Sequence, residues 1–158
     1  MGYELNIVRQ TDYQDGEEES NISLDEWLNY VSTDKELELT NGFETKIPGI
    51  AKTWQESPGF CNWVGHPKSD TDIIPWFDYG FGCITAKNPD CETIEKMIRI
   101  SIALNAKDRG DDFEYYDETY FTNGGHPILE QQTDTKIDQP LDNNIKKPWW
   151  KFWWRFPA

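Results

Sequence analysis

The sequence predicts an α+β domain in which a mostly antiparallel sheet carries two helices on one face. Three observations support this fold class. Several short segments alternate apolar and polar residues, two longer segments have helical spacing, and turn-forming dipeptides separate them. We expect the order β-α-β-β-β-β-α-β over residues 1–120, a linker over 121–145, and a flexible basic aromatic tail over 146–158.

The first strand and the first helix both carry local signals. Residues 3–7 alternate apolar and polar side chains, as a half-buried strand does. Ser23 and Glu26 have the spacing of a capping box, and Ile22 and Trp27 that of a hydrophobic staple. The helix should begin at Ser23 and end around residues 32–34. Its expected buried stripe consists of Leu24, Trp27, Leu28 and Val31.

The middle of the chain is predicted to contain short strands joined by tight turns. Asn41-Gly42 is a strong hairpin signal because both residues accept positive φ, so we expect the strands before and after it to pair directly. Gly80 and Gly82 flank Phe81 in a second turn. The expected strands lie at 37–39, 43–47, 50–54, 60–64, 73–79 and 83–87.

The cleanest helical period in the sequence follows the last of these strands. Asn88 is placed to cap this helix, and Pro89 suits its first position, where no N–H donor is needed. Asn105 tolerates the left-handed conformation in which helices often end. A strand over 111–116 would complete a right-handed crossover. The expected buried stripe consists of Ile94, Met97, Ile98, Ile102, Ala103 and Leu104, with Glu92, Glu95, Lys96 and Arg99 off it.

The composition restricts the possible functions. The formal net charge is −14, which argues against nucleic-acid binding, because neutralising phosphates requires clustered Lys and Arg. A basic protein partner is the natural complement of such a charge. The three cysteines lack the spacing of a zinc site or a disulfide framework and suit a reducing, cytoplasmic location. The N-terminus has no apolar signal core, and no apolar run is long enough to span a membrane.

The C-terminal sequence KKPWWKFWWRFPA differs from the rest of the chain. It combines aromatic rings with cations, a composition typical of segments that lie at a membrane interface, and the inner membrane is the one we expect here. Two alternatives remain open: the tail folds back on the acidic surface of its own domain, or it anchors a protein partner. The residues expected to make the membrane or partner contact are Trp149, Trp150, Lys151, Trp153, Trp154 and Arg155.

A protein-binding surface is predicted where aromatic and acidic residues occur together. Residues 76–79 place Trp76 beside Asp78, and residues 108–118 form a cluster of carboxylates. The cluster lacks the spacing of an EF-hand loop, so it is either a partner-binding surface or a solvated strand edge. The residues expected to contact a partner are Trp76, Asp78, Asp111, Asp112 and Glu114.

No motif in the sequence indicates catalysis. GxSxG, HExxH, P-loop and Rossmann glycine patterns are all missing, so we expect a protein that is not an enzyme and needs no cofactor. His66 and His126 each precede a proline in a predicted loop. Together with Cys61 they have no recognised ligand spacing, so we expect two surface histidines and no metal site.

Several segments resemble a group of small acidic bacterial proteins of the immunity type, which are encoded beside secreted antibacterial toxins. These segments are ISLDEWLNYV, WFDY with its glycine turn, KNPD with IEKMIRISIALNAK, and GDDFEYY, and the resemblance covers about residues 3–116. It implies a non-catalytic protein that binds and neutralises a cognate toxin. The matching residues are Ser23, Leu24, Glu26, Trp27, Trp76, Phe77, Lys87, Asn88, Pro89, Asp90, Met97, Gly110, Asp111 and Asp112.

Overall fold

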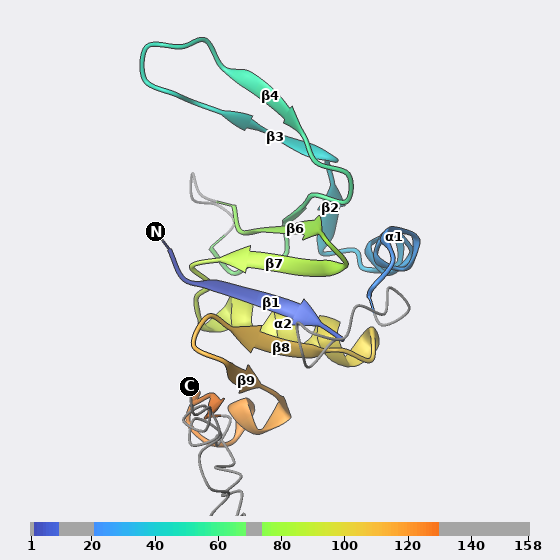
Figure 1. Cartoon of the computed structure of the whole chain (residues 1–158), viewed down its shortest axis with the longest axis vertical. Helices are drawn as coiled ribbons and strands as arrows, with labels where there is room; N and C mark the ends of the chain where they lie inside the picture. Colours follow the sequence, from blue (N-terminus) through green and yellow to red (C-terminus); the bar gives the residue numbers. More distant parts are fainter. Residues whose placement is uncertain (1, 10–20, 69–73, 130–158) are drawn as a thin grey trace, which may run out of the picture.

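The computed structural model describes residues 2–9, 21–68 and 74–129 and has the predicted α+β architecture (Figure 1). An eight-stranded sheet, a separate two-stranded sheet and two α-helices make up the fold. The elements in chain order are β1 Glu4–Val8, α1 Leu24–Thr33, β2 Leu37–Leu39, β3 Gly42–Thr45, β4 Thr53–Glu56, β5 Cys61–Trp63, β6 Trp76–Gly80, β7 Cys83–Lys87, α2 Cys91–Ala103, β8 Lys107–Gly110, β9 Glu114–Tyr116, the 3-10 helix η2 Glu118–Phe121 and β10 Ile128–Leu129.

The main sheet has the strand order β10-β9-β8-β1-β7-β6-β5-β2. Every neighbouring pair is antiparallel. Because β1 is antiparallel to both β7 and β8, those two strands run parallel to each other with β1 between them. Helix α2 is the connection that carries the chain from β7 over to β8, as a crossover requires.

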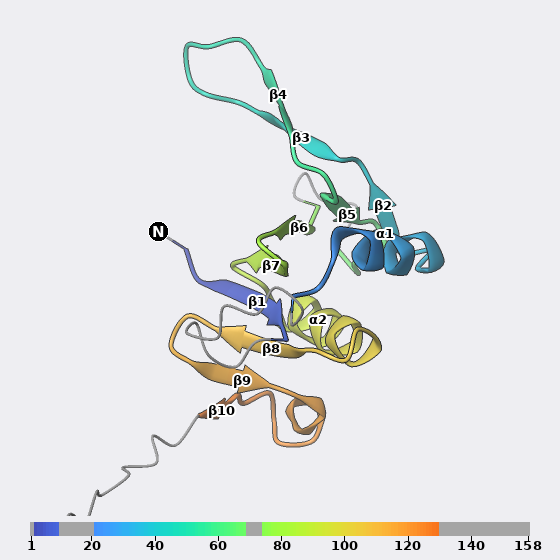
Figure 2. The same ribbon diagram turned by 45° about the vertical axis from the view of Figure 1, so that its right-hand side comes forward.

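Both helices pack on the same face of this sheet, as predicted (Figure 2). Leu5, Ile7 and Phe77 point to this face and are fully buried against it. Trp27 supplies the centre of the contact from α1, and its indole Nε1 donates to the backbone oxygen of Gly59 at 2.8 Å. Burial of these large apolar side chains is the main source of stability in the fold.

Helix α1 has the predicted N-terminus. Ser23 is the N-cap, and its Oγ accepts a hydrogen bond from the backbone N–H of Glu26 at 3.2 Å. Arg9, which follows β1, binds the carboxylate of Glu26 and also donates from Nε to the backbone oxygen of Leu104 at 3.1 Å. The hydrogen bond from Arg9 lowers the pKa of Glu26. This contact joins β1 and α1 to the end of α2.

Helix α2 begins two residues later than predicted. Asp90 is the N-cap, with its side chain accepting from the N–H of Thr93 at 3.0 Å, whereas Asn88 has φ +48° and binds the N–H of Tyr3. Pro89 therefore precedes the helix instead of opening it. Asn105, with φ +50°, follows the helix end as expected.

The buried stripe of α2 also differs in part from the prediction. Ile102 is 51% exposed, while Ile100 is fully buried. Lys96 is buried too, and its Nζ donates to Asp34 at 2.7 Å and to Glu36 at 2.6 Å. These two carboxylates follow α1 and are distant from Lys96 in the sequence. They neutralise the ammonium group, which is why it can be buried.

The predicted hairpin turn at Asn41-Gly42 is wrong, although Asn41 does have positive φ, at +54°. Strand β2 pairs with β5, and β3 pairs with β4. The strands 37–45 and 53–63 thus form one long ribbon, and Asn41-Gly42 lies where the ribbon leaves the main sheet. The chain reverses instead around Pro48-Gly49, at the far end of the ribbon.

The C-terminal part contains more structure than predicted. The strand expected over 111–116 is a turn followed by β9, and β8 precedes it at 107–110, where no strand was predicted. The fold continues through β10, beyond the expected boundary at residue 120. Six strands lie between the helices, one at or near each of the six expected segments, although the predicted order has four there. Three strands follow α2, where one was expected. Most of the predicted linker and all of the basic aromatic tail lie outside the described residues. No helix in the described part of the chain is long and apolar enough to cross a bilayer.

Candidate functional site on the open face of the sheet

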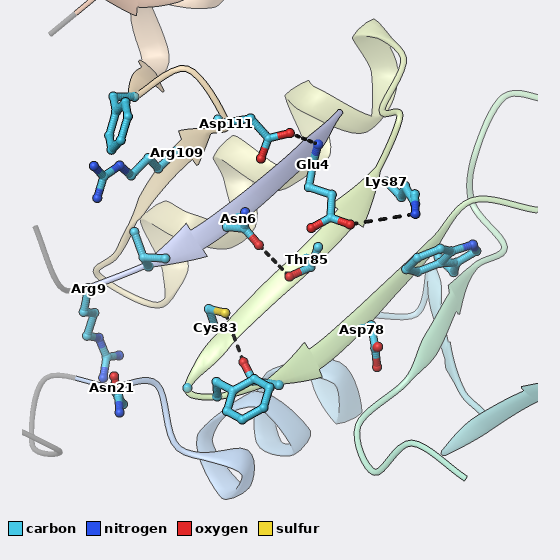
Figure 3. Close-up of a pocket in the computed structure, with 17 residues that line it drawn as sticks. Glu4, Asn6, Arg9, Asn21, Asp78, Cys83, Thr85, Lys87, Arg109 and Asp111 are labelled. Carbon is cyan, nitrogen blue, oxygen red and sulfur yellow. Dashed lines mark hydrogen bonds and ion pairs between the residues drawn. The ribbon is translucent and has the colours of Figure 1, made fainter. Parts of the chain in front are cut away.

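One side of the main sheet is not covered by any helix of the described residues, and it is hollowed and lined largely by residues with polar side chains (Figure 3). We call it the open face. Its hollow has a volume of about 750 Å³ and lies over the middle strands of the sheet. The strand residues that line it are Glu4, Asn6 and Val8 from β1, Trp76 and Asp78 from β6, Cys83, Thr85 and Lys87 from β7, and Arg109 from β8.

Alternation along the strands builds this face. In β1 the buried Leu5 and Ile7 point toward the helices, so Glu4 and Asn6 point the other way. The antiparallel register then aligns the outward side chains of neighbouring strands in rows across the sheet.

The central row contains Arg109, Asn6, Thr85 and Asp78, which are paired in that order across β8, β1, β7 and β6. The Thr85 hydroxyl donates to Asn6 Oδ1 at 2.6 Å. Asp78 Oδ1 accepts from the hydroxyl of Ser57 at 2.5 Å. The row therefore runs from a cation to an anion through two fixed polar groups.

The next row is formed around Glu4 and Lys87, which face each other across β1 and β7. Their Oε1 and Nζ atoms are 3.9 Å apart. The backbone N–H of Glu4 donates to Asp111 Oδ2 at 2.9 Å, which fixes Asp111 at one end of this row. Trp76 lies beside Lys87 at the other end, on β6.

Two phenylalanines with unusual backbone conformations line opposite ends of the hollow. Phe81 lies in the β6–β7 turn with φ +51°, and Phe113 lies in the β8–β9 turn with φ +63°. Phe81 is fully exposed, and Phe113 is 58% exposed. The guanidinium carbon of Arg109 lies 4.7 Å from the centre of the Phe113 ring.

A left-handed, exposed phenylalanine is costly in two ways. The conformation is unfavourable by about 1 kcal/mol or more for a residue with a Cβ, and the exposed ring gains nothing from burial. Phe81 and Gly82 form a two-residue turn in which both φ angles are positive, a type I′ turn in which Asn-Gly would be more stable. Packing explains neither the backbone conformation nor the full exposure of Phe81, so this turn is a candidate binding position.

The open face is balanced in charge, in contrast to the chain as a whole. Among the residues lining the hollow, the carboxylates are Glu4, Asp78 and Asp111, and the cations are Arg9, Lys87 and Arg109. The acidity at this site lies instead at its edge, where Asp111 and the exposed Asp112 precede Phe113.

The thiol on the open face is held in its neutral form. Burial raises the pKa of Cys83, and its Sγ donates to the backbone oxygen of Gly80 at 3.0 Å. A nucleophilic cysteine requires a lowered pKa and a neighbouring cation or base. This chemistry fits a binding surface better than a catalytic one.

The structure brings together three of the five predicted partner-contact residues. Trp76, Asp78 and Asp111 all line the hollow, and Asp112 is exposed beside it. Glu114 is only 5% exposed, because its carboxylate accepts from the hydroxyl of Tyr3 at 2.5 Å and from the N–H of Asp112 at 2.9 Å.

The expectation of a solvated acidic strand edge at 108–118 is therefore wrong in part. Asp108 is fully buried, as Glu114 nearly is, and β10 pairs with β9 where an edge was expected. Desolvation raises the pKa of Asp108 to about 8. Its Oδ2 accepts from Ser101 at 2.9 Å, while Oδ1 has no partner among the described residues.

The polar centre of the open face and both phenylalanines were not predicted as site residues. Asn6 and Thr85 are neutral residues on strands, where they resemble ordinary surface positions. Phe113 follows two aspartates in a segment that was predicted to be a strand, so the sequence did not indicate that Phe113 lies in a turn. Phe81 had a usable signal: a phenylalanine between two glycines, in a predicted turn, cannot pack in a strand.

His66 is buried, contrary to the prediction of a surface histidine, whereas His126 is exposed as expected. His66, Asp90 and Glu92 lie close enough to suggest a metal site. The backbone N–H of Lys68, however, donates to His66 Nδ1 at 3.0 Å, so the ring proton is on Nε2, which donates to Asp90 at 3.1 Å. A metal on Nε2 would require the opposite tautomer, so we assign the histidine to holding the loop after β5 on the start of α2.

Comparison with known proteins gives no match: no family model, no curated protein and no solved structure is significantly similar to the chain.

Proposed function

We propose that this chain is an immunity-type protein, which neutralises a basic antibacterial toxin in the producing cell by binding it through the open face and covering its active site. The observation that carries the proposal is the pair of exposed, left-handed phenylalanines at the two ends of a polar hollow. Rigid aromatic anchors beside ordered polar groups are the usual composition of an interaction hot spot.

The scaffold beneath the open face supports this reading. Leu5, Ile7 and Phe77 alternate with the outward residues and are fully buried, so the strands that carry the polar rows are fixed by the core. The side chains of Asn6, Thr85 and Asp78 are already hydrogen-bonded in the free protein. A preorganised surface of this kind loses little conformational entropy when a partner binds.

The charge of the chain supports a basic partner. A net charge of −14 attracts a cationic domain over a distance and accelerates association, to about 10⁸–10⁹ M⁻¹s⁻¹ at low salt in favourable cases. The balanced charge of the open face then suits close contact, because few unpaired charges have to be buried. The resemblance to immunity-type proteins points in the same direction.

The decisive experiment is co-expression of this chain with the toxin encoded beside its gene. We expect rescue of growth by the wild-type protein and loss of rescue by Phe81→Ala and Asp78→Ala. With purified proteins, each substitution should weaken binding by about 10-fold or more. Ile102→Ala removes an exposed apolar side chain from the helix side of the molecule and is the matched control. A toxin that stays lethal with the wild-type chain present would exclude the proposal.

A second function, attachment to a membrane surface, is favoured by the sequence of the basic aromatic tail alone. Trp149, Lys151 and Trp153 illustrate the alternation of rings and cations that suits an anionic bilayer interface. The test is co-sedimentation with vesicles containing phosphatidylglycerol, for the full chain and for a chain ending at Asn144. Equal partitioning of the two chains would exclude this function.

A further inference from the structure

The ribbon formed by β3 and β4 extends away from the rest of the molecule. We call residues 42–56 the arm. Figures 1 and 2, which differ by a 45° rotation, both show it projecting beyond the main sheet. Its two strands pair with each other, and neither joins a third strand among the described residues. The base of the arm is fixed, since Phe43 packs on Phe60 with ring centres 4.9 Å apart.

The arm exposes more apolar surface than an isolated hairpin can support. Ile47, Ile50 and Trp54 are 54%, 61% and 53% exposed. All four residues of β4 are exposed. Ile47 and Ile50 lie in the connection between the two strands, and Trp54 lies on β4. A two-stranded ribbon is marginally stable in water, and a strand with a free edge and an exposed aromatic ring is a template for pairing with another chain. These features indicate that β4 is completed by a partner.

The position of Trp54 is specified by the sequence. Its ring lies over Gly42, where an added Cβ would be 2.7 Å from the ring and 2.4 Å from the backbone oxygen of Gln55. Only glycine permits this contact, which holds the indole flat on the ribbon while leaving about half of it exposed.

The charge of the arm separates it from the rest of the chain. Lys46 and Lys52 balance Glu44 and Glu56, so the arm is neutral within a molecule of net charge −14. Two copies of so acidic a protein repel each other over most of their surfaces, but not at this ribbon. The arm is therefore a place where a second copy can approach.

We propose that β4 pairs antiparallel with β4 of a second copy, centred on Trp54, so that the protein forms a two-fold symmetric dimer through the arm. In this register Trp54 faces Trp54, and Lys52 of each copy faces Glu56 of the other. The arm thus meets the requirement that a two-fold interface be complementary to itself. Opposite charges placed across two strands are stabilising, and the symmetry supplies the pair twice.

In the free chain the charges of Lys52 and Glu56 are both available to pair with a second copy. Lys52 Nζ lies 3.0 Å from Glu44, but both side chains are more than half exposed, so the pair contributes little. Glu56 forms no ion pair within the described part of the chain. Because a single added strand pairing is a small interface, we expect a dissociation constant in the micromolar range.

The test is sedimentation velocity of the full chain between about 5 and 500 µM. We expect the sedimentation coefficient to rise with concentration toward that of a dimer. Glu56→Lys places lysines opposite each other and should weaken the dimer by about 10-fold. The double variant Lys52→Glu and Glu56→Lys restores opposite charges and should recover affinity to within about threefold. Lys46→Glu, at the residue that follows β3, carries the same kind of charge reversal and should leave the dimer unchanged.

The charge swap separates this register from other modes of association. A monomer at every concentration would overturn the proposal. So would a dimer that Glu56→Lys leaves intact, or one that Lys46→Glu weakens, because either result would place the contact elsewhere. Circular dichroism and thermal unfolding of each variant show whether the arm substitutions leave the domain folded.

Discussion

The two faces of the main sheet are built by the same strands but obey different constraints. On the helix side, β1 presents Leu5 and Ile7 and β6 presents Phe77, all fully buried. On the open side, Asn6 and Asp78 alternate with them and line the hollow. On the packed face, the type of each residue is determined by the volume and apolarity that the core requires. On the open face, packing does not require the residues that are present.

The difference between the two faces shows which residues are informative about function. A phenylalanine in the core needs no explanation beyond burial. Phe81 is exposed in a strained turn, so packing gives no reason for its presence. Conversely Asp108, on the packed face, is a charge-bearing residue where an apolar one would be expected.

The largest effect is expected from adjacent residues on β6 that point to opposite faces. Phe77→Ala removes a fully buried ring and should lower the free energy of unfolding by about 3–5 kcal/mol. Asp78→Ala should lower it by about 1 kcal/mol, through loss of the hydrogen bond from Ser57. Urea denaturation followed by circular dichroism measures both. Similar losses would show that the open face is also a packing surface.

The second prediction concerns the buried carboxyl of Asp108, whose pKa is raised to about 8 by desolvation. The folded protein keeps this proton until about pH 8, whereas the unfolded chain releases it near pH 4. The contribution of Asp108 to stability is therefore complete below about pH 4, decreases progressively between about pH 4 and pH 8, and is absent above about pH 8. Asp108→Asn should remove this dependence and stabilise the protein by about 2–4 kcal/mol at pH 8.

The measurement is the difference in unfolding free energy between wild type and Asp108→Asn, taken from about pH 5 to pH 9. The exposed Asp112→Asn is the matched control, and its difference from wild type should stay small and nearly constant. A constant difference for Asp108→Asn as well would mean that this carboxyl ionises normally in the folded state.

The smallest effect is expected at the β6–β7 turn. Phe81→Asn converts the turn to Asn-Gly, which accepts positive φ, and no packing is lost because the ring is fully exposed. The free energy of unfolding should rise by about 0.5–1 kcal/mol, while binding to the toxin should weaken. Gly82→Ala is the opposite control: its φ is +77° and an added Cβ would lie 2.5 Å from Asn21. If Phe81→Asn destabilises the domain, the ring has a structural role after all.

Much of the fold could be predicted because local signals agree with the tertiary structure. The capping box at Ser23, the alternation around Leu5 and the helical period around Met97 each describe one element alone. The predictions are wrong where a contact with a residue distant in the sequence determines the local structure. Asn88 meets the requirements of a cap but is used by Tyr3, so Asp90 caps the helix. The buried position of Lys96 depends on carboxylates that follow the other helix, which no local pattern shows.

The candidate site could be predicted only in part, for a similar reason. Trp76, Asp78 and Asp111 were identified by residue type, and the hollow does contain them. The arrangement in rows depends on the strand order, which places β1 between β7 and β8. That order brings residue 6 beside residues 85 and 109, and no spacing in the sequence indicates it.

The central place of β1 has a consequence for how the chain is made. Strand β1 leaves the ribosome well before β7 and β8, the two strands to which it hydrogen-bonds, which end at Lys87 and Gly110. Until residue 110 has emerged, β1 cannot pair with both β7 and β8. Its apolar side chains therefore stay without a complete sheet and core around them. Such sequence-distant pairing slows folding and lengthens the time during which a nascent chain depends on chaperones.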